Sequence, residues 1–587
     1  MRFSSSVGFV VFTSRLAAAA TKEETVTYSH YPITGVHTGI DRATGSRPLR
    51  RNILDLQKDE PTWSLYIQAL AAMQGTPETS LLSYYQIAGI HGRPYTTWDN
   101  VGPGVNTPLT GYCTHDSVLF PSWHRPYLVL YEQVLANHVQ MIASTYSGSA
   151  SHVYKTAADN FRIPYWDWAS VPHMPHVANA EQIMISTPSG VRNVSNPLLQ
   201  YQFQEFPFDK KYFPSSKDVA SDWYLAFYSR TVRNPDTADS ISNFSHANKV
   251  LENANLKDQY YALTKSADYD EFATGAVWGP SIENVHSAVH LAIGGVWGHM
   301  SQLSYSSFDP IFWLHHVNVD RLTALYQAMR PTSYLTPYPD HYGSYTLQGG
   351  GKINDTLSTP LQPFSTDTHG NFWTSSSAQS LGGFGYSYPE IQDWNQTPSR
   401  LQANVIAQVN ALYGRSISKV KRSDLELQVR LKEWSVRISV SKFELHGQRF
   451  IVHTFLGDIP QDPLEWSVSN ACVGSFPLLP PVSYTVNPHH RVPTYHEFSL
   501  TEGLKARGYD GQDSTLTATF LQEALQWKVQ LVNGTVVPND RLDSLSVQVL
   551  EGTVTLGSSI FKLPEYGERI VHPQITKGKL GDMRTGR

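Results

Sequence analysis

Histidines at helical spacing constrain the fold of this chain more than any other feature. His286 and His290 stand four residues apart in a segment with a helical pattern, residues 281–291, so both imidazoles would lie on one face of one helix. A random chain with 23 histidines in 587 residues would contain roughly one such pair, so the pair alone is weak support. Further histidines lie in aromatic and apolar segments elsewhere: His91, His115, His124, His315 and His316. A fold that brings these segments together would create a metal site.

Helical patterns accompany the first group of histidines. Apolar residues recur at helical intervals in residues 54–75 and again in 84–90, which places His91 near the end of a helix. Pro126 suits the first turn of a helix that would follow His124.

A further helix is expected from Asp309, which can cap free amides, with Pro310 in the first turn. This helix would carry the adjacent pair His315 and His316. Four helices would then present five metal ligands, and a loop would present His115. Helix bundles commonly build metal sites in this way, from side chains on facing helices.

The chemistry of the ligands favours copper. Neutral imidazoles bind several transition metals, and zinc is the usual metal for an isolated histidine cluster. Two sets of three histidines with no carboxylate or thiolate suit a pair of copper ions better. The sequence therefore predicts a dicopper site, with a single zinc or a metal-free structural protein as the alternatives.

Composition limits the other classes of protein. The chain has 587 residues, a net charge of -5, 12% aromatic and 16% charged residues, which fits a folded protein with more than one domain. The charge balance shows no bias toward nucleic acid or anionic membranes, and no apolar run reaches the roughly 18 residues that span a bilayer. Cys113 and Cys472 are the only cysteines, which excludes a disulfide framework.

The pattern changes from helical to alternating after about residue 395. We predict a mainly α domain, a four-helix bundle with long loops, over residues 21–395, a linker over 396–424 that begins with a helical pattern, and a β-rich, sandwich-like domain over 425–587. The strand-like runs are residues 425–429, 434–440, 449–456, 516–521 and 545–550. Residues 1–20 resemble a signal peptide that Arg15 interrupts, which leaves secretion and an intracellular location both open.

The histidine segments resemble the two copper-binding halves of tyrosinases. The first half is Cys113-Thr114-His115, eight residues, then His124-Arg125-Pro126-Tyr127; the second is His286-x-x-x-His290, a spacer, then Asp309-Pro310-Ile311-Phe312-Trp313-Leu314-His315-His316-x-Asn318-Val319-Asp320-Arg321. Tyr386-Ser387-Tyr388 near the end of the first domain, the chain length and the extra C-terminal domain resemble the fungal members. Molluscan haemocyanin units share this pattern, so an oxygen carrier is an alternative.

The resemblance implies a ligand set for each ion. Copper A would be held by His91, His115 and His124, and copper B by His286, His290 and His316. In the family the second histidine of the doublet is the ligand, and the phenylalanine four residues earlier, here Phe312, lies over the opposite copper. His315 would then point elsewhere.

The resemblance also implies roles for three more residues. Cys113 would form a thioether to the ring of His115, the alternative being a free buried thiol. Glu283 would hold a water that helps to deprotonate a phenol, the alternative being a carboxylate on the helix surface. Many members that hydroxylate monophenols have asparagine where this chain has Ser287, and serine orients a water less fully, which puts monophenol hydroxylation in doubt.

The implied activity is oxidation of monophenols or o-diphenols, such as tyrosine, DOPA and catechols, to o-quinones with O2, leading to melanin-like pigment. A catechol oxidase without monophenol activity is the nearest alternative. The C-terminal domain would shield the site until a protease removes it, and Lys421-Arg422 would be a cleavage site or an ordinary solvated charge run. Some fungal relatives deliver copper with Cys-x-x-Cys, but Cys472-Val473-Gly474-Ser475 lacks the second cysteine.

Overall fold

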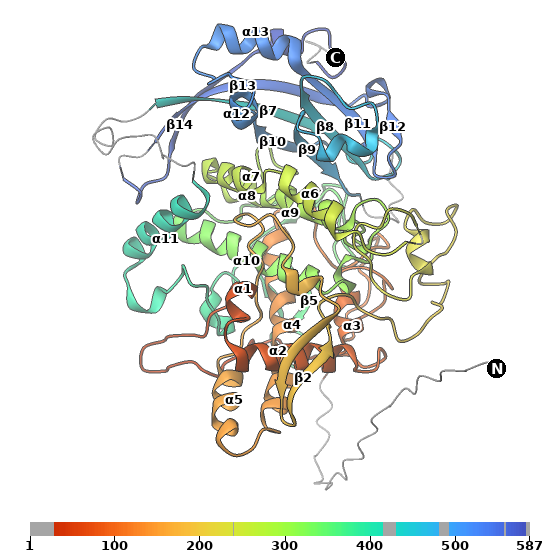
Figure 1. Ribbon diagram of the computed structural model, residues 1–587, viewed down its shortest axis with the longest axis vertical. Coiled ribbons are helices and arrows are strands. Elements are labelled where there is room, and N and C mark those ends of the chain that lie inside the picture. The colour runs from red at the N-terminus through yellow and green to blue at the C-terminus, as the bar shows by residue number, and fades with distance from the viewer. Residues whose placement is uncertain (1–28, 239, 415–429, 481–491, 557–558, 583–587) are drawn as a thin grey trace, which may run out of the picture.

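A helical domain and a β-rich domain follow one another along the chain, as the sequence predicts. The computed structural model describes residues 29–238, 240–414, 430–480, 492–556 and 559–582. The C-terminal domain, blue in Figure 1, lies across one end of the helical domain, above α6, α7 and α9. Residues 1–20, which resemble a signal peptide, lie outside the described residues.

The helical domain is organised around α2 (Glu60–Gln74), α4 (Phe120–Ala143), α9 (Ile282–Gly294) and α10 (Ile311–Met329). The helix α4 packs against α2 and α10, and α10 also contacts α9. Almost every residue of α10 is buried, so this helix forms the centre of the domain. The helix predicted over residues 281–291 is found, and the Ser281 side chain caps it by accepting a hydrogen bond from the Asn284 amide. The helix predicted from Asp309 begins at Ile311, so Pro310 directly precedes it, and the Asp309 side chain accepts a hydrogen bond from the Ile311 amide.

Shorter helices and hairpins cover this centre. The helices are α1 (Ile53–Leu56), α3 (Tyr84–Gly89), α5 (Ser149–Asp159), α6 (Phe244–Asn253), α7 (Leu256–Ala262) and α8 (Tyr269–Ala273). The strand pairs are β1 (Gln182–Thr187) with β2 (Gly190–Ser195), β3 (Tyr338–Pro339) with β4 (Asn354–Asp355), and β5 (Pro360–Ser365) with β6 (Phe372–Thr374).

The start of α4 differs from the prediction. Pro126 was expected in the first turn, but the helix begins at Phe120 and Pro126 lies inside it. Pro121 takes the early position, where a missing N–H costs nothing because the first amides of a helix have no partner. As a result His124 lies within the helix.

The helix α11 (Pro398–Tyr413) occupies most of the segment expected to be a linker. The helical pattern over residues 401–413 is thus confirmed, and the helix packs against α10. Its buried side chains, including Val405 and Val409, belong to the core of the helical domain. The Tyr413 hydroxyl donates to Asp167 and accepts a hydrogen bond from Arg321. The helical domain therefore extends at least to residue 413.

Two antiparallel four-stranded sheets make up the C-terminal domain. Their orders are β10-β7-β13-β14 and β12-β11-β8-β9. The strands are β7 (Arg430–Val440), β8 (Phe450–Leu456), β9 (Cys472–Leu478), β10 (Thr494–Ser499), β11 (Leu525–Leu531), β12 (Val536–Val537), β13 (Ser546–Thr555) and β14 (Glu565–Val571). Every residue of β8 is buried, as expected for a strand covered on both faces. One cover is the helical domain, since Ile451 of β8 packs against Leu291 of α9.

One predicted strand is a helix. Residues 516–521 lie inside α13 (Ser514–Ala524), where the Asp513 side chain accepts a hydrogen bond from the Leu516 amide and caps the helix. A short apolar run does not by itself distinguish helix from strand. Two further helices, α12 (Thr501–Lys505) and α14 (Pro573–Thr576), flank the sheets. The predicted strand 425–429 lies outside the described residues.

Buried ion pairs and hydrogen bonds join the two domains. Lys265 of the helical domain lies 2.6 Å from Glu433 and 3.9 Å from Glu497, both in the C-terminal sheets. Arg449, just before β8, donates to the Ser301 carbonyl at 2.7 Å. Within the described part of the chain, none of the helices combines the length and hydropathy needed to cross a membrane.

Candidate metal centre

The helices carry most of the predicted ligands into one buried volume. His124 lies on α4, His286 and His290 lie on α9, and His316 lies on α10. His91 comes two residues after α3, and His115 lies in the loop before α4. All but His115 are at most 2% exposed.

The imidazole nitrogens converge in two overlapping groups. The Nε2 atom of His316 lies 3.3 Å from Nε2 of His286 and 3.1 Å from Nε2 of His290. His316 also forms a group with His91 and His124, in which one nitrogen of each residue lies within 4.8 Å of the others. The structure therefore brings the two predicted halves together at His316.

Backbone carbonyls orient four of the rings. The Nδ1 atoms of His91, His124, His286 and His290 lie 2.7–3.1 Å from the carbonyls of Leu303, Phe120, Glu283 and Met300, respectively. A proton on Nδ1 leaves the lone pair on Nε2, which is the tautomer that binds metal.

The inward nitrogens fit a metal. The Nε2 atoms of His91, His115 and His124 are buried and have no hydrogen-bond partner. Burial lowers the pKa of His124 to about 3 and that of His290 to about 4, so both rings are neutral at pH 7. Neutral nitrogens with free lone pairs and no carboxylate among them form a donor set suited to copper.

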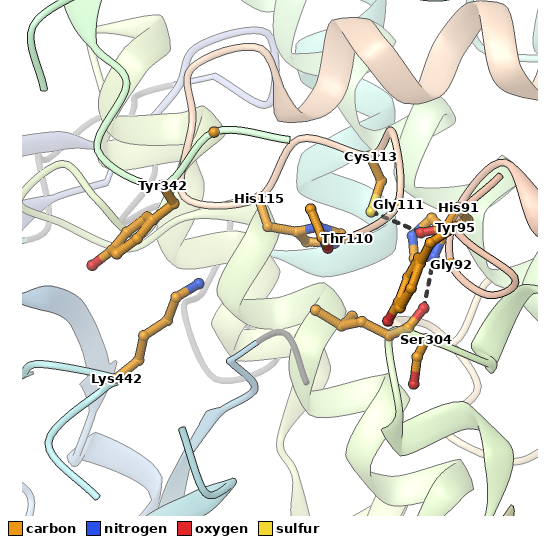
Figure 2. A pocket seen from close by; sticks show the side chains of 12 residues that line it. His91, Gly92, Tyr95, Thr110, Gly111, Cys113, His115, Ser304, Tyr342 and Lys442 are labelled. Atoms are coloured by element: carbon orange, nitrogen blue, oxygen red, sulfur yellow. Dashed lines mark hydrogen bonds between the residues drawn. The ribbon is translucent and has the colours of Figure 1, made fainter. Parts of the chain in front are cut away.

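Cys113 lies beside the ring that it was predicted to modify. Ligand atoms of His91, Cys113 and His115 lie within 4.8 Å of one another. The Cys113 thiol lies 3.1 Å from the His91 carbonyl, to which it can donate (Figure 2). Burial raises the pKa of Cys113 well above its ordinary value, so the group is a thiol and not a thiolate.

Glu283 joins the helix α9 to the loop that carries His115. Its carboxylate accepts hydrogen bonds from the Asp116 amide at 2.7 Å, the Thr274 hydroxyl at 2.6 Å and the Gly275 amide at 3.2 Å. The side chain is buried, which excludes the surface position considered as an alternative, and burial raises its pKa above the ordinary value while these hydrogen bonds oppose the shift.

Phe312 and Ser287 lie next to the predicted ligands. The Phe312 ring stacks on His316 at a centroid distance of 4.0 Å, as positions four residues apart on a helix allow, and meets the edge of His91 at 5.0 Å. The Ser287 hydroxyl lies 3.5 Å from Nδ1 of His286, at the limit for a hydrogen bond.

His315 does not point away as predicted. One of its nitrogens lies within 4.8 Å of nitrogens of His286, His290 and His316, and its ring stacks on His286 at a centroid distance of 5.1 Å. The copper B side of the site thus contains four buried imidazoles.

Sequence reasoning missed an ion pair between the domains at this site. Lys442, which follows β7, pairs with Asp116, the residue after His115, and lies 4.6 Å above the ring of Tyr342. Figure 2 shows the lysine reaching toward His115 from the C-terminal domain. No local signal could have found the pair, because its partners are far apart in sequence and each is an ordinary charged residue on its own.

A small cavity lies on the His91 and His115 side of the cluster. It measures about 20 Å³ and is lined by His91, Cys113, His115, Tyr342 and Lys442, among others. That volume accommodates roughly one water molecule, far less than a phenol ring.

Charged residues behind the site fix the helices that carry the ligands. Asp320 of α10 accepts hydrogen bonds from Arg125 of α4 at 2.7 Å and from Arg50 at 3.2 Å. Arg50 also binds Glu132 of α4 at 2.9 Å, and all four side chains are buried. Because each charge is paired and hydrogen-bonded, the network holds α4 against α10 in one register.

A helix bundle with a buried, all-histidine cluster of this size defines a protein with a dinuclear metal centre. The sequence profile described as "Common central domain of tyrosinase" matches residues 81–329, and that described as "Tyrosinase C-terminal domain" matches residues 433–549. A tyrosinase of Neurospora crassa is 31% identical over 94% of this chain and 98% of its own length. A tyrosinase of Podospora anserina is 34% identical over 77% of this chain and 90% of its own length.

The structural comparison also points to tyrosinases. A recombinant mushroom tyrosinase superimposes with a TM-score of 0.79 at 26% identity, covering 92% of this chain and 98% of that one. The chain belongs to the tyrosinase family. It is a copper-dependent phenol oxidase with a dinuclear copper centre and a C-terminal domain.

Proposed function

We propose that His91, His115 and His124 hold one copper ion and that His286, His290 and His316 hold the other. The observation that carries this assignment is the convergence of their ring nitrogens in overlapping groups, in which His115 is grouped with His91. The Nε2 atoms of His91, His115 and His124 are buried without a hydrogen-bond partner. When bound, the copper pair supplies the two-electron redox chemistry by which O2 oxidises a phenol. The protein supplies ligand geometry, a dry cavity and a position for the substrate.

We further propose that the products are o-quinones formed from o-diphenols such as DOPA and catechols, which polymerise to melanin-like pigment. Phe312, packed on His316, would form an apolar wall beside the substrate ring. Glu283 accepts three hydrogen bonds, so only its remaining lone pairs are free to hold a water. With Ser287 in place of an amide, this arrangement supports diphenol oxidation more strongly than monophenol hydroxylation.

Oxygen consumption tests this order of activities. With the copper-loaded chain after removal of the C-terminal domain, a catechol should be oxidised without delay, whereas tyrosine should react more slowly and after a lag. Ser287→Asn should raise the tyrosine rate relative to the catechol rate, because an amide can orient a water with both a donor and an acceptor. Equal initial rates with both phenols, unchanged in the variant, would contradict the proposal.

We propose that Cys113 is linked to the His115 ring by a thioether in the mature protein. Their proximity and the buried, unreactive thiol support a reaction at the copper site and not in solution. The peptide that spans both residues should lack two hydrogen atoms by mass spectrometry in copper-treated protein only. Apoprotein should show the unmodified mass and, after denaturation, an alkylatable Cys113; an alkylatable thiol in the copper-treated protein would exclude the link.

We propose that the C-terminal domain keeps the enzyme latent and that a protease releases it. Lys442 of the C-terminal domain supports this view, because it pairs with Asp116 beside His115 and lines the small cavity of about 20 Å³ on that side of the cluster. The domain boundary would lie between α11 and β7, because α11 packs into the helical core. Lys421-Arg422 remains the predicted cleavage site and lies outside the described residues.

Lys442→Met should raise the basal rate of catechol oxidation in the uncut chain by at least about tenfold. Breaking a buried pair leaves a charge without a partner and costs roughly 3–5 kcal/mol. Each 1.4 kcal/mol of that cost would change the equilibrium between the closed and open states about tenfold. Asp116 belongs to the helical domain, and its carboxylate becomes solvated when the C-terminal domain moves away. Loss of the lysine charge therefore favours separation of the domains over unfolding of the helical domain. The measurement is the oxidation rate before and after protease.

A double variant provides the control for this prediction. Lys442→Met combined with Asp116→Asn removes both charges and should return much of the latency. A Lys442→Met chain as inactive as the original, with full activity after protease, would show that the pair does not contribute to closure.

A further inference from the structure

The doublet His315 and His316 differs from the other histidines of the site in how it is held. No backbone carbonyl orients either ring in the described structure: Nδ1 of His316 and both nitrogens of His315 are buried without a hydrogen-bond partner. A buried imidazole that makes no hydrogen bond loses the solvation of both nitrogens, which destabilises the folded state. For His316 the proposed copper ligation at Nε2 offsets the loss, but His315 has no assigned role.

His315 is close enough to bind the same ion as its neighbours. One nitrogen each of His286, His290, His315 and His316 lies within 4.8 Å of all the others. Imidazole nitrogens bind a metal at roughly 2.0–2.1 Å, so two ligands of one ion lie at most about 4.2 Å apart. Nitrogens around a tetrahedral ion lie roughly 3.4 Å apart, so shifts on the order of 1 Å would place His315 in the coordination sphere with His286 and His290.

The two members of the doublet have different neighbours. Phe312 stacks on His316 at 4.0 Å and restricts its ring, while His315 faces the indole of Trp168 at 5.8 Å and the flat face of His286 at 5.1 Å. Its ring is surrounded by apolar atoms and neutral imidazoles, which favours an uncharged donor, and no carbonyl fixes its tautomer. A ligand of this kind can accept an ion and release it without breaking another bond.

We propose that His315 is an auxiliary copper ligand. It forms, with His286 and His290, a second three-histidine position next to copper B, which receives the ion during loading and retains it when His316 is displaced. Exchange between the two positions replaces one neutral nitrogen ligand by another and changes neither charge nor oxidation state. The proposal rests on the assignment of His286, His290 and His316 to copper B.

Copper stoichiometry of the full-length chain tests the proposal without reference to activity. Apoprotein is titrated with Cu(I) in competition with a chelator, and bound metal is counted by mass spectrometry. The original chain should bind two ions, and His316→Gln should still bind two, the second about 10–100-fold more weakly, since His315 substitutes for the lost ligand. The double variant His315→Gln with His316→Gln should bind one. His453→Gln, which removes a fully buried imidazole from the C-terminal domain, is the matched control and should bind two.

The outcomes separate this proposal from the one on which it rests. If His316→Gln binds one ion, or if the single and double variants bind equally, His315 is not a ligand. If the original chain binds fewer than two ions, the six-histidine assignment fails as well. Should the double variant not fold, pulsed electron paramagnetic resonance of Cu(II) in His316→Gln decides: three coordinated imidazoles at the weaker ion support the proposal, and two overturn it.

Discussion

Replacing His290 by asparagine should leave one copper ion per chain and lower catechol oxidation by at least about a hundredfold, because His290 belongs to both proposed positions of the second ion, the one with His316 and the one with His315. Loss of a group that merely orients a metal ligand costs roughly 10–100-fold in affinity or activity, and loss of the ligand itself should cost more. His290 is buried, its ring is oriented by the Met300 carbonyl, and its Nε2 atom lies 3.1 Å from that of His316. Metal analysis and oxygen consumption, both after removal of the C-terminal domain, measure the two effects.

A histidine outside the cluster is the control for this variant. His246 lies on α6, where its ring contacts Asn234, and His246→Asn should retain both copper ions and the full rate. If His290→Asn kept two tightly bound ions and normal oxidation, the proposed copper B set would be wrong. Comparison of the apoproteins by thermal unfolding separates loss of copper from loss of fold.

Cutting the chain between α11 and β7 should raise catechol oxidation by at least about tenfold, and the rise should depend on dilution. Under the proposed latency, the C-terminal domain of the uncut chain would close the site as an intramolecular partner, at an effective concentration on the order of millimolar for a short connection. After a cut the two parts are held only by the interface, which includes Lys265 with Glu433 and Arg449 with the Ser301 carbonyl. Dilution then separates them and opens the site.

A specific protease site inserted into residues 415–429 allows the test, with the chain lacking that site as the control. The rate per molecule is measured from micromolar to nanomolar concentration after the cut is complete on a gel. The uncut chain should show one low rate throughout. A fully cut chain that stays as slow as the uncut one at the lowest concentration would contradict latency by the C-terminal domain.

Local patterns in the sequence predicted the helices and most of the histidine cluster well. His286 and His290 follow from helical spacing, and the helical stretch predicted over residues 281–291 agrees with α9 at its start. The order of a helical and a β-rich domain follows from the change of apolar period. These features depend on residues close together in the chain, which is why one sequence suffices to find them.

The predictions were wrong or incomplete where the structure depends on contacts between distant residues, or where two local signals compete. Pro126 and Pro121 both suit a first turn, and only the packed structure selects Pro121. The resemblance predicts that His315 points away from the site, but a helix that is buried all round can present adjacent residues to the same cluster. The pairing of Lys442 with Asp116 joins residues 326 positions apart and has no local signature.

The charges shared by Asp320, Arg125, Arg50 and Glu132 have a consequence for biogenesis. They join the two helices through side chains that are not proposed copper ligands, so we expect the scaffold to keep its shape without the metal. We therefore expect folding to precede metallation, so that the chain reaches its final architecture first and acquires the ions later. Calorimetry of the metal-free polypeptide should accordingly show a cooperative transition of its own.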